Sequence, residues 1–212
     1  MNRRLAHLVS AAGFCLGTLV LLAGTPNAAR AQTPDCALIN MTVTASVSND
    51  PGFEGLYKYT VVGSWDVGER ALSHLDIFLA FQECACKCDN RIFKFPAVAG
   101  TSNGVNGATS CTVNYLGSYV CKGDPSIPDA LKAPTVKFDD NDGACQPLTV
   151  GSGSWVFYSP FPPGPFSVYP DAVAIKHGLQ TCLGDLKGVL PICDCAVPAL
   201  PSTWGHIKSS YR

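Results

Sequence analysis

The chain has 212 residues, 15 Lys and Arg against 16 Asp and Glu, a net charge of −1, and 11 cysteines. A mildly acidic surface without basic clusters argues against nucleic acid and anionic membranes as partners. A single domain of this length can bury a sizeable core without help.

Residues 1–31 are predicted to be a secretory signal peptide. Arg3 and Arg4 make a basic start, residues 8–23 form an apolar run, and Ala29-Arg30-Ala31 gives a small-x-small cleavage pattern. The apolar run is shorter than the roughly 20 residues of a membrane-spanning helix. The mature chain is therefore expected to begin near Gln32 with a net charge of 12 − 16 = −4, and nothing later in it is apolar enough to span a bilayer.

Strand signals follow one another along the mature chain, with turn residues between them. The eleven-residue run at 71–81 fits a strand better than a buried helix because turn residues flank it. Strands are expected at 40–48, 56–65, 71–81, 91–95, 135–138 and 153–159 and within 167–178 and 188–193, with a loop at 96–110, a hairpin at 111–121 and a proline-rich crossing at 160–166. This pattern predicts an all-β fold, a disulfide-stapled antiparallel β-sandwich (immunoglobulin-like or related) over 32–200, with a tail at 201–212.

Ten cysteines remain after the leader, and an even number in an exported chain predicts disulfides. They are Cys36, Cys84, Cys86, Cys88, Cys111, Cys121, Cys145, Cys182, Cys193 and Cys195. On a strand, Cys84, Cys86 and Cys88 would point to one face at intervals of roughly 6.6 Å, too far apart and too parallel to pair with one another. We expect at least one bridge from this cluster to Cys193 or Cys195, and a bridge between Cys111 and Cys121 that closes a hairpin.

A metal or redox role for the clustered cysteines is the alternative to disulfides. Structural zinc sites use C-x₂₋₄-C turns that let two sulfurs converge, and C-x-C on a strand spaces them too widely. The C-x-x-C of thioredoxin-like centres is missing from the sequence. No metal and no cofactor are therefore expected.

Ser73, His74 and Asp76 invite a hydrolase interpretation, because nucleophile, base and orienting acid are all present. Adjacent residues of one strand face opposite sides, and the chain contains no G-x-S-x-G elbow. The expectation is that Ser73 or His74 binds backbone groups near a sheet edge. His177 and His206 have no ligand-like companions nearby, so the sequence predicts no catalytic residue and no enzyme.

Two features keep a binding module open as the alternative function. The run Asp139, Asp140, Asn141, Asp142 and Gly143 offers oxygen ligands for calcium, although its register does not match an EF-hand loop. A carbohydrate-binding face could be built from the aromatic residues, which most often form core in β folds. These residues are Tyr57, Tyr59, Trp65, Trp155, Phe157, Tyr158 and Phe161.

Three stretches resemble elements of exported bacterial β-sandwich proteins of uncharacterised function. They are "YKYTVVGSWDVGERALSHLDIFL", with its Y-x-Y-x-V and Ser-His pattern, "AIKHGLQTCLGDLKGVLPIC", and the tail "PSTWGHIKSSYR", which is similar to T-W-G-x-[IV]-K-x-x-[YF]-R. The resemblance covers about a third of the mature chain. It implies a β-sandwich exported from the cell without enzymatic role.

The sequence therefore predicts a structural or adhesive module that is secreted or held at the outer cell surface, with the periplasm as the other location. Its partner is unknown, and a cell-surface or extracellular polymer is the class we expect. The alternatives are a carbohydrate- or calcium-dependent binding module and, third, a secreted hydrolase. Trp204, Ile207, Lys208, Tyr211 and Arg212 in the tail would form either a sorting signal or a terminal turn that packs Trp204 on the domain.

Overall fold

The computed structural model describes residues 38–68, 71–79, 88, 91–128, 133–141, 143–165, 173–178 and 180–193. The strands are β1 (Leu38–Val47), β2 (Tyr57–Asp66), β3 (His74–Phe78), β4 (Gly100–Asn106), β5 (Thr109–Val120), β6 (Thr135–Asp140), β7 (Gln146–Pro147), β8 (Val150–Ser159), β9 (Pro163–Pro165), β10 (Val173–His177) and β11 (Gln180–Pro191). The predicted signal peptide, the tail and Cys36, Cys84, Cys86 and Cys195 lie outside these residues. None of the described segments forms a helix long and apolar enough to cross a membrane.

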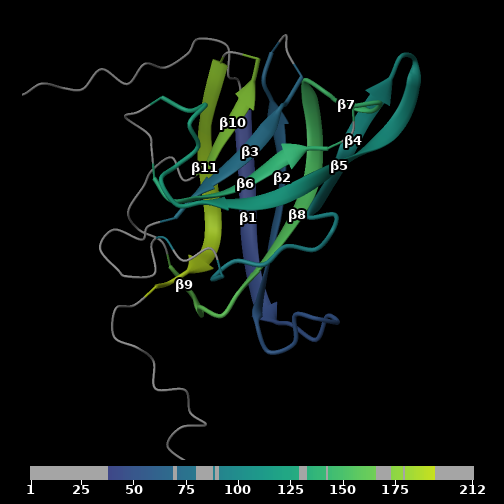
Figure 1. Cartoon of the computed structure of the whole chain (residues 1–212). Helices are drawn as coiled ribbons and strands as arrows, with labels where there is room; N and C mark the ends of the chain where they lie inside the picture. Colours follow the sequence, from purple (N-terminus) through teal and green to yellow (C-terminus); the bar gives the residue numbers. More distant parts are fainter. Residues whose placement is uncertain are drawn as a thin grey trace, which may run out of the picture. The chain divides into compact units, whose positions relative to one another are not determined.

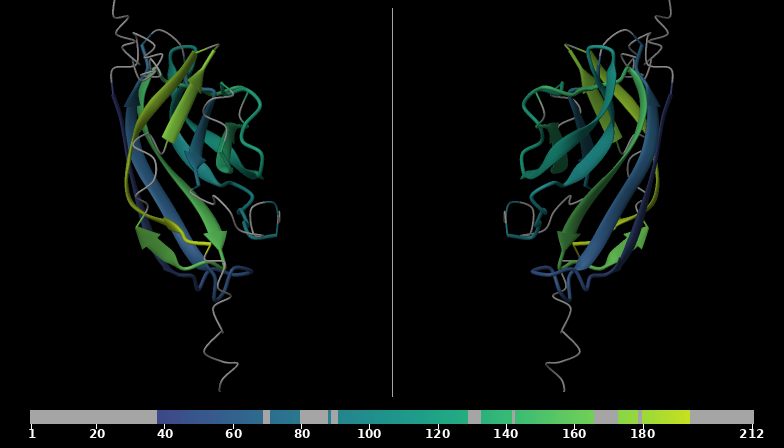
Figure 2. Two further views of the ribbon diagram at one scale, coloured as in Figure 1. Left: turned by 90° about the vertical axis from the view of Figure 1, so that its left-hand side faces the viewer. Right: turned by 90° about the vertical axis from the view of Figure 1, so that its right-hand side faces the viewer.

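The all-β prediction is confirmed, but the predicted β-sandwich is wrong because nine of the strands close into a barrel. They follow the order β1-β2-β8-β4-β5-β6-β3-β10-β11, and β11 returns to pair with β1. Figure 1 shows β8, β2, β1 and β11 side by side as one wall, with β5 and β6 crossing in front. The views in Figure 2 show this long wall curving along one side and the teal strands β4, β5 and β6 facing it. A sandwich would leave the outermost strands unpaired, whereas closure removes the sheet edges.

The barrel closes along a seam where β1 and β11 pair in parallel. All other pairings among the described strands are antiparallel. Asn40, Met41, Thr42 and Val43 pair with Asp185, Leu186, Lys187 and Gly188. Gly188 has φ +113°, and a Cβ built on it would lie 1.9 Å from the Val43 carbonyl oxygen. Only glycine allows the two backbones to approach this closely at that conformation.

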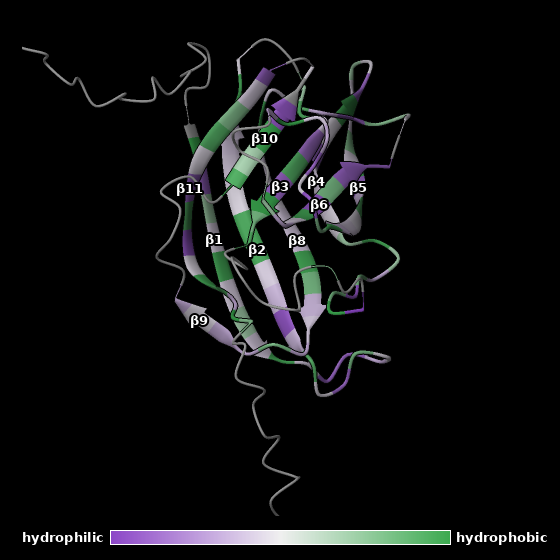
Figure 3. Cartoon of the chain, turned by 60° about the vertical axis from the view of Figure 1, so that its left-hand side comes forward, coloured by the Kyte–Doolittle hydropathy of each residue, from purple (hydrophilic) through white to green (hydrophobic). Residues whose placement is uncertain are grey.

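Aromatic side chains fill the interior of the barrel. Trp155 is fully buried and lies beside Trp65, Tyr115 and Phe138, with ring centroids 5.9, 5.6 and 6.4 Å away. The strands alternate between apolar and polar residues along their length (Figure 3), as expected of a wall with one face on the core. The inward side chains therefore form a packed core and leave the outward face as the place for a functional site.

Four tyrosines, three of them buried and Tyr119 half-buried, make the barrel sensitive to alkaline pH. Burial raises the pKa of Tyr115 and Tyr119 to about 12 and raises that of Tyr59 further; burial and a hydrogen bond to Asp50 raise the pKa of Tyr158 to about 12. In the unfolded chain these hydroxyls titrate near pH 10. Between pH 10 and 12 the native state therefore holds more protons than the unfolded state, so stability falls as pH rises.

Absorbance at 295 nm follows the ionisation of the chain's seven tyrosines. We expect these four to ionise only as the near-ultraviolet circular dichroism of the folded barrel is lost. The control is the same chain in guanidinium, where all tyrosines should ionise near pH 10. Ionisation of all seven near pH 10 with the native dichroism intact would contradict the buried placement.

The segment from residue 91 to residue 121 differs most from the sequence prediction. The predicted loop at 96–110 contains β4. Residues 111–120 of the predicted hairpin at 111–121 belong to one continuous strand, β5, which pairs with β4 on one side and β6 on the other. The predicted strand at 91–95 makes only a bridge from Lys94 to Tyr158.

The predicted proline-rich crossing contains a short strand, β9, which pairs with the end of β11. Proline has no backbone N–H to donate, and this matters least in a three-residue strand at an edge.

The disulfide prediction is confirmed for six cysteines, but the predicted Cys111–Cys121 bridge is wrong. Cys111 is bonded to Cys145 and Cys121 to Cys88, with Cα separations of 6.0 and 5.0 Å. Ten residues along one extended strand span roughly 33 Å, so Cys111 and Cys121 cannot meet. Cys182 and Cys193 are also disulfide-bonded. The expected bridge from the 84–88 cluster to Cys193 or Cys195 is not made by Cys88, and Cys84 and Cys86 lie outside the described residues.

Candidate functional site

Strand β3 is unusual because all five of its residues are buried. Leu75 and Ile77 point into the aromatic core, so His74, Asp76 and Phe78 lie on the outer face of the barrel wall. Residues 121–128, which follow β5 and are called the covering segment here, lie over this face. Ile127 of the covering segment packs on Phe78 and on Ala174 of the neighbouring β10. The fold thereby buries polar groups on the outside of a closed barrel.

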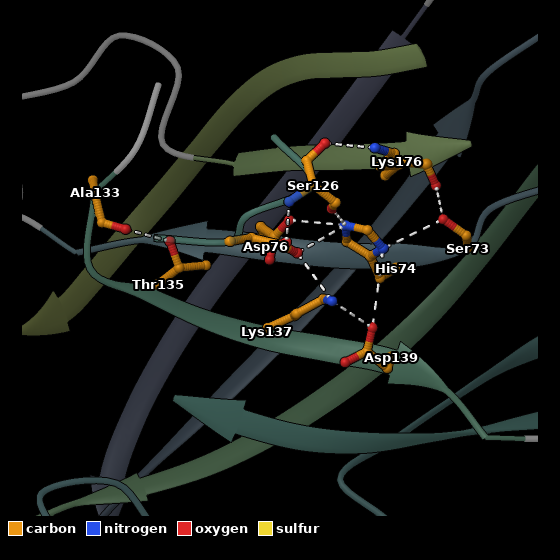
Figure 4. Close-up of polar contacts among 10 residues, drawn as sticks. Ser73, His74, Asp76, Ser126, Ala133, Thr135, Lys137, Asp139 and Lys176 are labelled. Atoms are coloured by element: carbon orange, nitrogen blue, oxygen red, sulfur yellow. Dashed lines mark hydrogen bonds and ion pairs between the residues drawn. The ribbon is translucent and has the colours of Figure 1, made fainter. Parts of the chain in front are cut away.

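His74 is the centre of a polar cluster under the covering segment (Figure 4). Its Nε2 atom lies 3.2 Å from Asp76 Oδ2, 3.1 Å from Asp124 Oδ2 and 3.3 Å from Ser126 Oγ. His74 is 6% exposed, Asp76 0% and Asp124 1%. Two buried carboxylates and a hydroxyl therefore converge on one nitrogen of one imidazole.

The geometry of the cluster is fixed by a hydrogen bond within the covering segment and by lysine side chains that reach it from β6 and β10. The Ser126 amide donates to Asp124 Oδ1 at 2.7 Å, an Asx turn that aims the other carboxylate oxygen at His74. Lys137 of β6 extends Nζ to Asp124 Oδ2 at 3.0 Å and to Asp139 Oδ1 at 2.8 Å. Lys176 of β10 donates through Nζ to the Ser126 carbonyl. Both strands that flank β3 thus hold the covering segment in place.

The pKa values in the cluster follow burial and contact. Burial raises the pKa of Asp76, and the neighbouring His74 offsets this only in part. Burial alone would raise the pKa of Asp124, but hydrogen bonds from Ser126 and Lys137 lower it. For Lys137 the burial cost is outweighed by hydrogen bonds to Asp139 and Asp124, so its pKa is raised. The Asp76 carboxylate is therefore the least well compensated charge of the group.

Ser73 is close to His74 but is not arranged as a nucleophile. It precedes β3, and its Oγ lies 3.3 Å from His74 Nδ1, so the hydroxyl reaches the ring although sequence neighbours were expected to point apart. The hydroxyl donates to the Lys176 carbonyl oxygen at 2.9 Å. A serine nucleophile must give its proton to the imidazole, and here that proton is given to the backbone. The prediction that Ser73 binds a backbone group is confirmed, but β3 lies between β6 and β10 and is no sheet edge.

The other predicted site residues are not brought together. Asp139 pairs with Lys137 and lies 4.0 Å from His74 Nδ1, while Asp142 lies outside the described residues. His206 and the side chain of His177 lie outside them as well. The aromatic residues considered for carbohydrate binding do not form an open face: Tyr59, Trp65, Trp155, Phe157 and Tyr158 are buried, and Tyr57 and Phe161 pack against the core.

A shallow surface depression lies on another part of the barrel, over β2, β4, β5 and β8. Its lining includes Thr101, Asn103, Thr112, Ser152 and Ser154. Asn103 Oδ1 accepts a hydrogen bond from the Ser152 amide at 2.9 Å, which holds the rim where the β4–β8 ladder ends. The depression thus presents hydroxyl and amide groups to solvent, apart from the His74 cluster.

Comparison with protein-family models, with curated proteins and with solved structures gives no match for this chain. The resemblance to exported bacterial proteins stays a prediction.

Sequence reasoning missed Asp124, Ser126 and Lys137, which complete the cluster around His74. The one local signal was Asp-Pro-Ser at 124–126, a typical Asx-turn sequence. That signal predicts a turn, and it carries no information on which strand the turn covers.

Proposed function

We propose that the protein is an exported structural or adhesive module without catalytic activity. The disulfides indicate an oxidising compartment, and we infer that the protein is secreted or held at the outer cell surface. A closed barrel stapled by disulfides suits a module that must persist outside the cytoplasm.

The burial of the His74 cluster is the observation that carries this proposal. Its Nε2 atom faces Asp76, Asp124 and Ser126 beneath the covering segment, and its Nδ1 faces Ser73. A general base has to reach a substrate proton directly or through one water. An imidazole that is 6% exposed and occupied on both sides is suited to holding structure together.

The depression over β2, β4, β5 and β8 favours a polymer rich in hydroxyl groups as the partner. Thr101, Asn103 and Thr112 are exposed side chains that can donate and accept hydrogen bonds. The aromatic residues that would stack on sugar rings are in the core. A polysaccharide would therefore be held by hydrogen bonds on an open face, which gives weak contacts that add up along a repeating polymer.

We expect beads coated with the oxidised protein to be retained on insoluble polysaccharides such as cellulose or chitin, and Thr101→Arg to reduce retention several-fold. The bulky charged side chain would cover the depression. Thr44→Arg is the matched control because Thr44 is also an exposed strand threonine, on β1. Equal retention of the two variants would remove this face from the adhesive role.

The non-catalytic part of the proposal is tested with a fluorophosphonate probe, which labels serine nucleophiles. We expect no more labelling of the native chain than of Ser73→Ala. Labelling that depends on Ser73 and on His74 would show that the protein is a hydrolase.

A further inference from the structure

The donor atoms around His74 Nε2 have the spacing of a metal coordination shell. Asp124 Oδ2, Asp76 Oδ2 and Ser126 Oγ lie 3.1, 3.2 and 3.3 Å from this nitrogen. The ligand atoms of His74, Asp76 and Asp124 all lie within 4.8 Å of one another. Ligands about 2.0–2.1 Å from a tetrahedral zinc ion are separated from each other by about 3.3–3.4 Å.

Hydrogen bonds alone do not satisfy the cluster. One Nε2 proton faces three acceptors, and it can make one good hydrogen bond among them. Asp76 is fully buried and directed at His74, whose Nε2 lies 3.2 Å from Oδ2, but neither carboxylate oxygen meets a donor of the described residues in hydrogen-bond geometry. A buried carboxylate without a well-aligned hydrogen-bond donor is costly, and a cation at the point where the ligand atoms meet would remove that cost.

We propose that His74, Asp76, Asp124 and Ser126 form a structural site for a zinc-like divalent cation. Imidazole together with carboxylate oxygens suits first-row divalent ions, zinc foremost. With a neutral imidazole, the charges of Asp76 and Asp124 balance the two positive charges of the ion. Lys137 is balanced separately by Asp139 at 2.8 Å, so the loaded cluster is close to neutral.

The arrangement fits a structural ion better than a catalytic one. Four protein donors from β3 and the covering segment enclose the ion, whereas a catalytic zinc keeps a coordination position open. Asp124 Oδ2 is also held by Lys137 at 3.0 Å, the kind of outer contact that orients metal ligands. The ion would fasten residues 121–128 to the barrel wall, which goes beyond the proposed adhesive role and does not depend on it.

The test uses the untagged full chain, exported with its disulfides intact, stripped with a chelator and reloaded with zinc. We expect one tightly held zinc ion per chain. X-ray absorption should show nitrogen and oxygen ligands at about 2.0–2.1 Å and no sulfur at about 2.3 Å. A wild-type chain that takes up no zinc, or zinc bound by sulfur, would overturn the proposal, and neither result depends on how a variant folds.

Variants locate the ion. Asp76→Asn and His74→Gln should each lower zinc affinity by about 100-fold or more, measured by competition with a chromophoric chelator. Asp185→Asn is the control of the same chemistry, because Asp185 is an exposed carboxylate on β11, outside the cluster; it should stay within about three-fold of wild type, since it supplies neither a ligand nor a contact to one. Near-ultraviolet circular dichroism checks that each variant is folded. Unchanged affinity in folded Asp76→Asn would place the ion elsewhere and refute the site.

Discussion

Gly188→Ala should lower the free energy of unfolding by about 3 kcal/mol or more, since backbone strain and overpacking each cost about 1–3 kcal/mol. Gly188 lies in the β1–β11 seam with φ +113°, and an added Cβ would lie 1.9 Å from the Val43 carbonyl oxygen and 3.2 Å from the Val43 nitrogen. Both obstacles are backbone atoms of a paired strand, so they cannot move away as a flexible side chain could. Denaturant unfolding followed by tryptophan fluorescence measures the effect.

Gly52→Ala is the control that separates the steric overlap at the β1–β11 seam from the cost of backbone strain. Gly52 has φ +82°, and nothing lies within 4 Å of a Cβ built on it. Its replacement should cost only the left-handed backbone penalty of about 1–2 kcal/mol. Equal losses for the two variants would mean that β1 and β11 do not lie against each other as a closed barrel requires.

Removing the Cys111–Cys145 bridge should be the second large effect. The bridge closes a loop of 34 residues in sequence, from β5 to the residue before β7. Restriction of the unfolded chain by such a loop is worth about 3–4 kcal/mol in the chain-entropy model. The double variant Cys111→Ala/Cys145→Ala should therefore be folded but less stable by about that amount, measured by denaturant unfolding without reductant.

The pairing itself is tested by counting thiols. Cys111→Ala/Cys145→Ala removes both ends of one bridge, so it should react with no more thiol reagent than the native chain does. Cys111→Ala/Cys121→Ala takes one end from each of two bridges and should free two thiols, those of Cys145 and Cys88. The reverse result would restore the hairpin bridge that the sequence suggested.

The strands that could be predicted from the sequence are those with alternating apolar residues. The predicted strands at 40–48, 56–65 and 153–159 correspond to β1, β2 and β8 because alternation is a local signal. Closure of the barrel depends on β1 meeting β11, which lies more than a hundred residues later. No local pattern encodes that pairing, so the same strands were assigned to a sandwich.

Strand β4 was taken for a loop because it is rich in glycine, asparagine and serine. The structure gives its glycines a packing role. A Cβ on Gly100 would lie 2.1 Å from Trp155 Cδ1, and one on Gly104 would lie 2.5 Å from Val113 Cγ2 and 2.7 Å from Cys145 Sγ. The need for glycine at these positions comes from side chains that pack against them from distant parts of the chain, which the local sequence of 96–110 does not show.

Only part of the candidate site could be predicted from the sequence. Ser73, His74 and Asp76 stood out because they are neighbours in the sequence, and they were set aside because adjacent residues of one strand face opposite sides and the chain has no G-x-S-x-G elbow. The partners come from the covering segment and β6, about 50 to 65 residues later. The pairing of β3 with β6, which opposes His74 to Asp139 and Asp76 to Lys137, brings the two parts together, and Lys137 of β6 and Lys176 of β10 hold the covering segment over β3.

Amide hydrogen exchange along β1 tests the closed barrel most directly. Successive amides of Asn40, Met41, Thr42 and Val43 point alternately toward β2 and β11. If the barrel is closed, all four amides are hydrogen-bonded to β2 or β11 and exchange slowly. If β1 is the edge of a sandwich, every second amide in this run exchanges rapidly, and the placement of the His74 cluster on the outside of a closed wall falls with it.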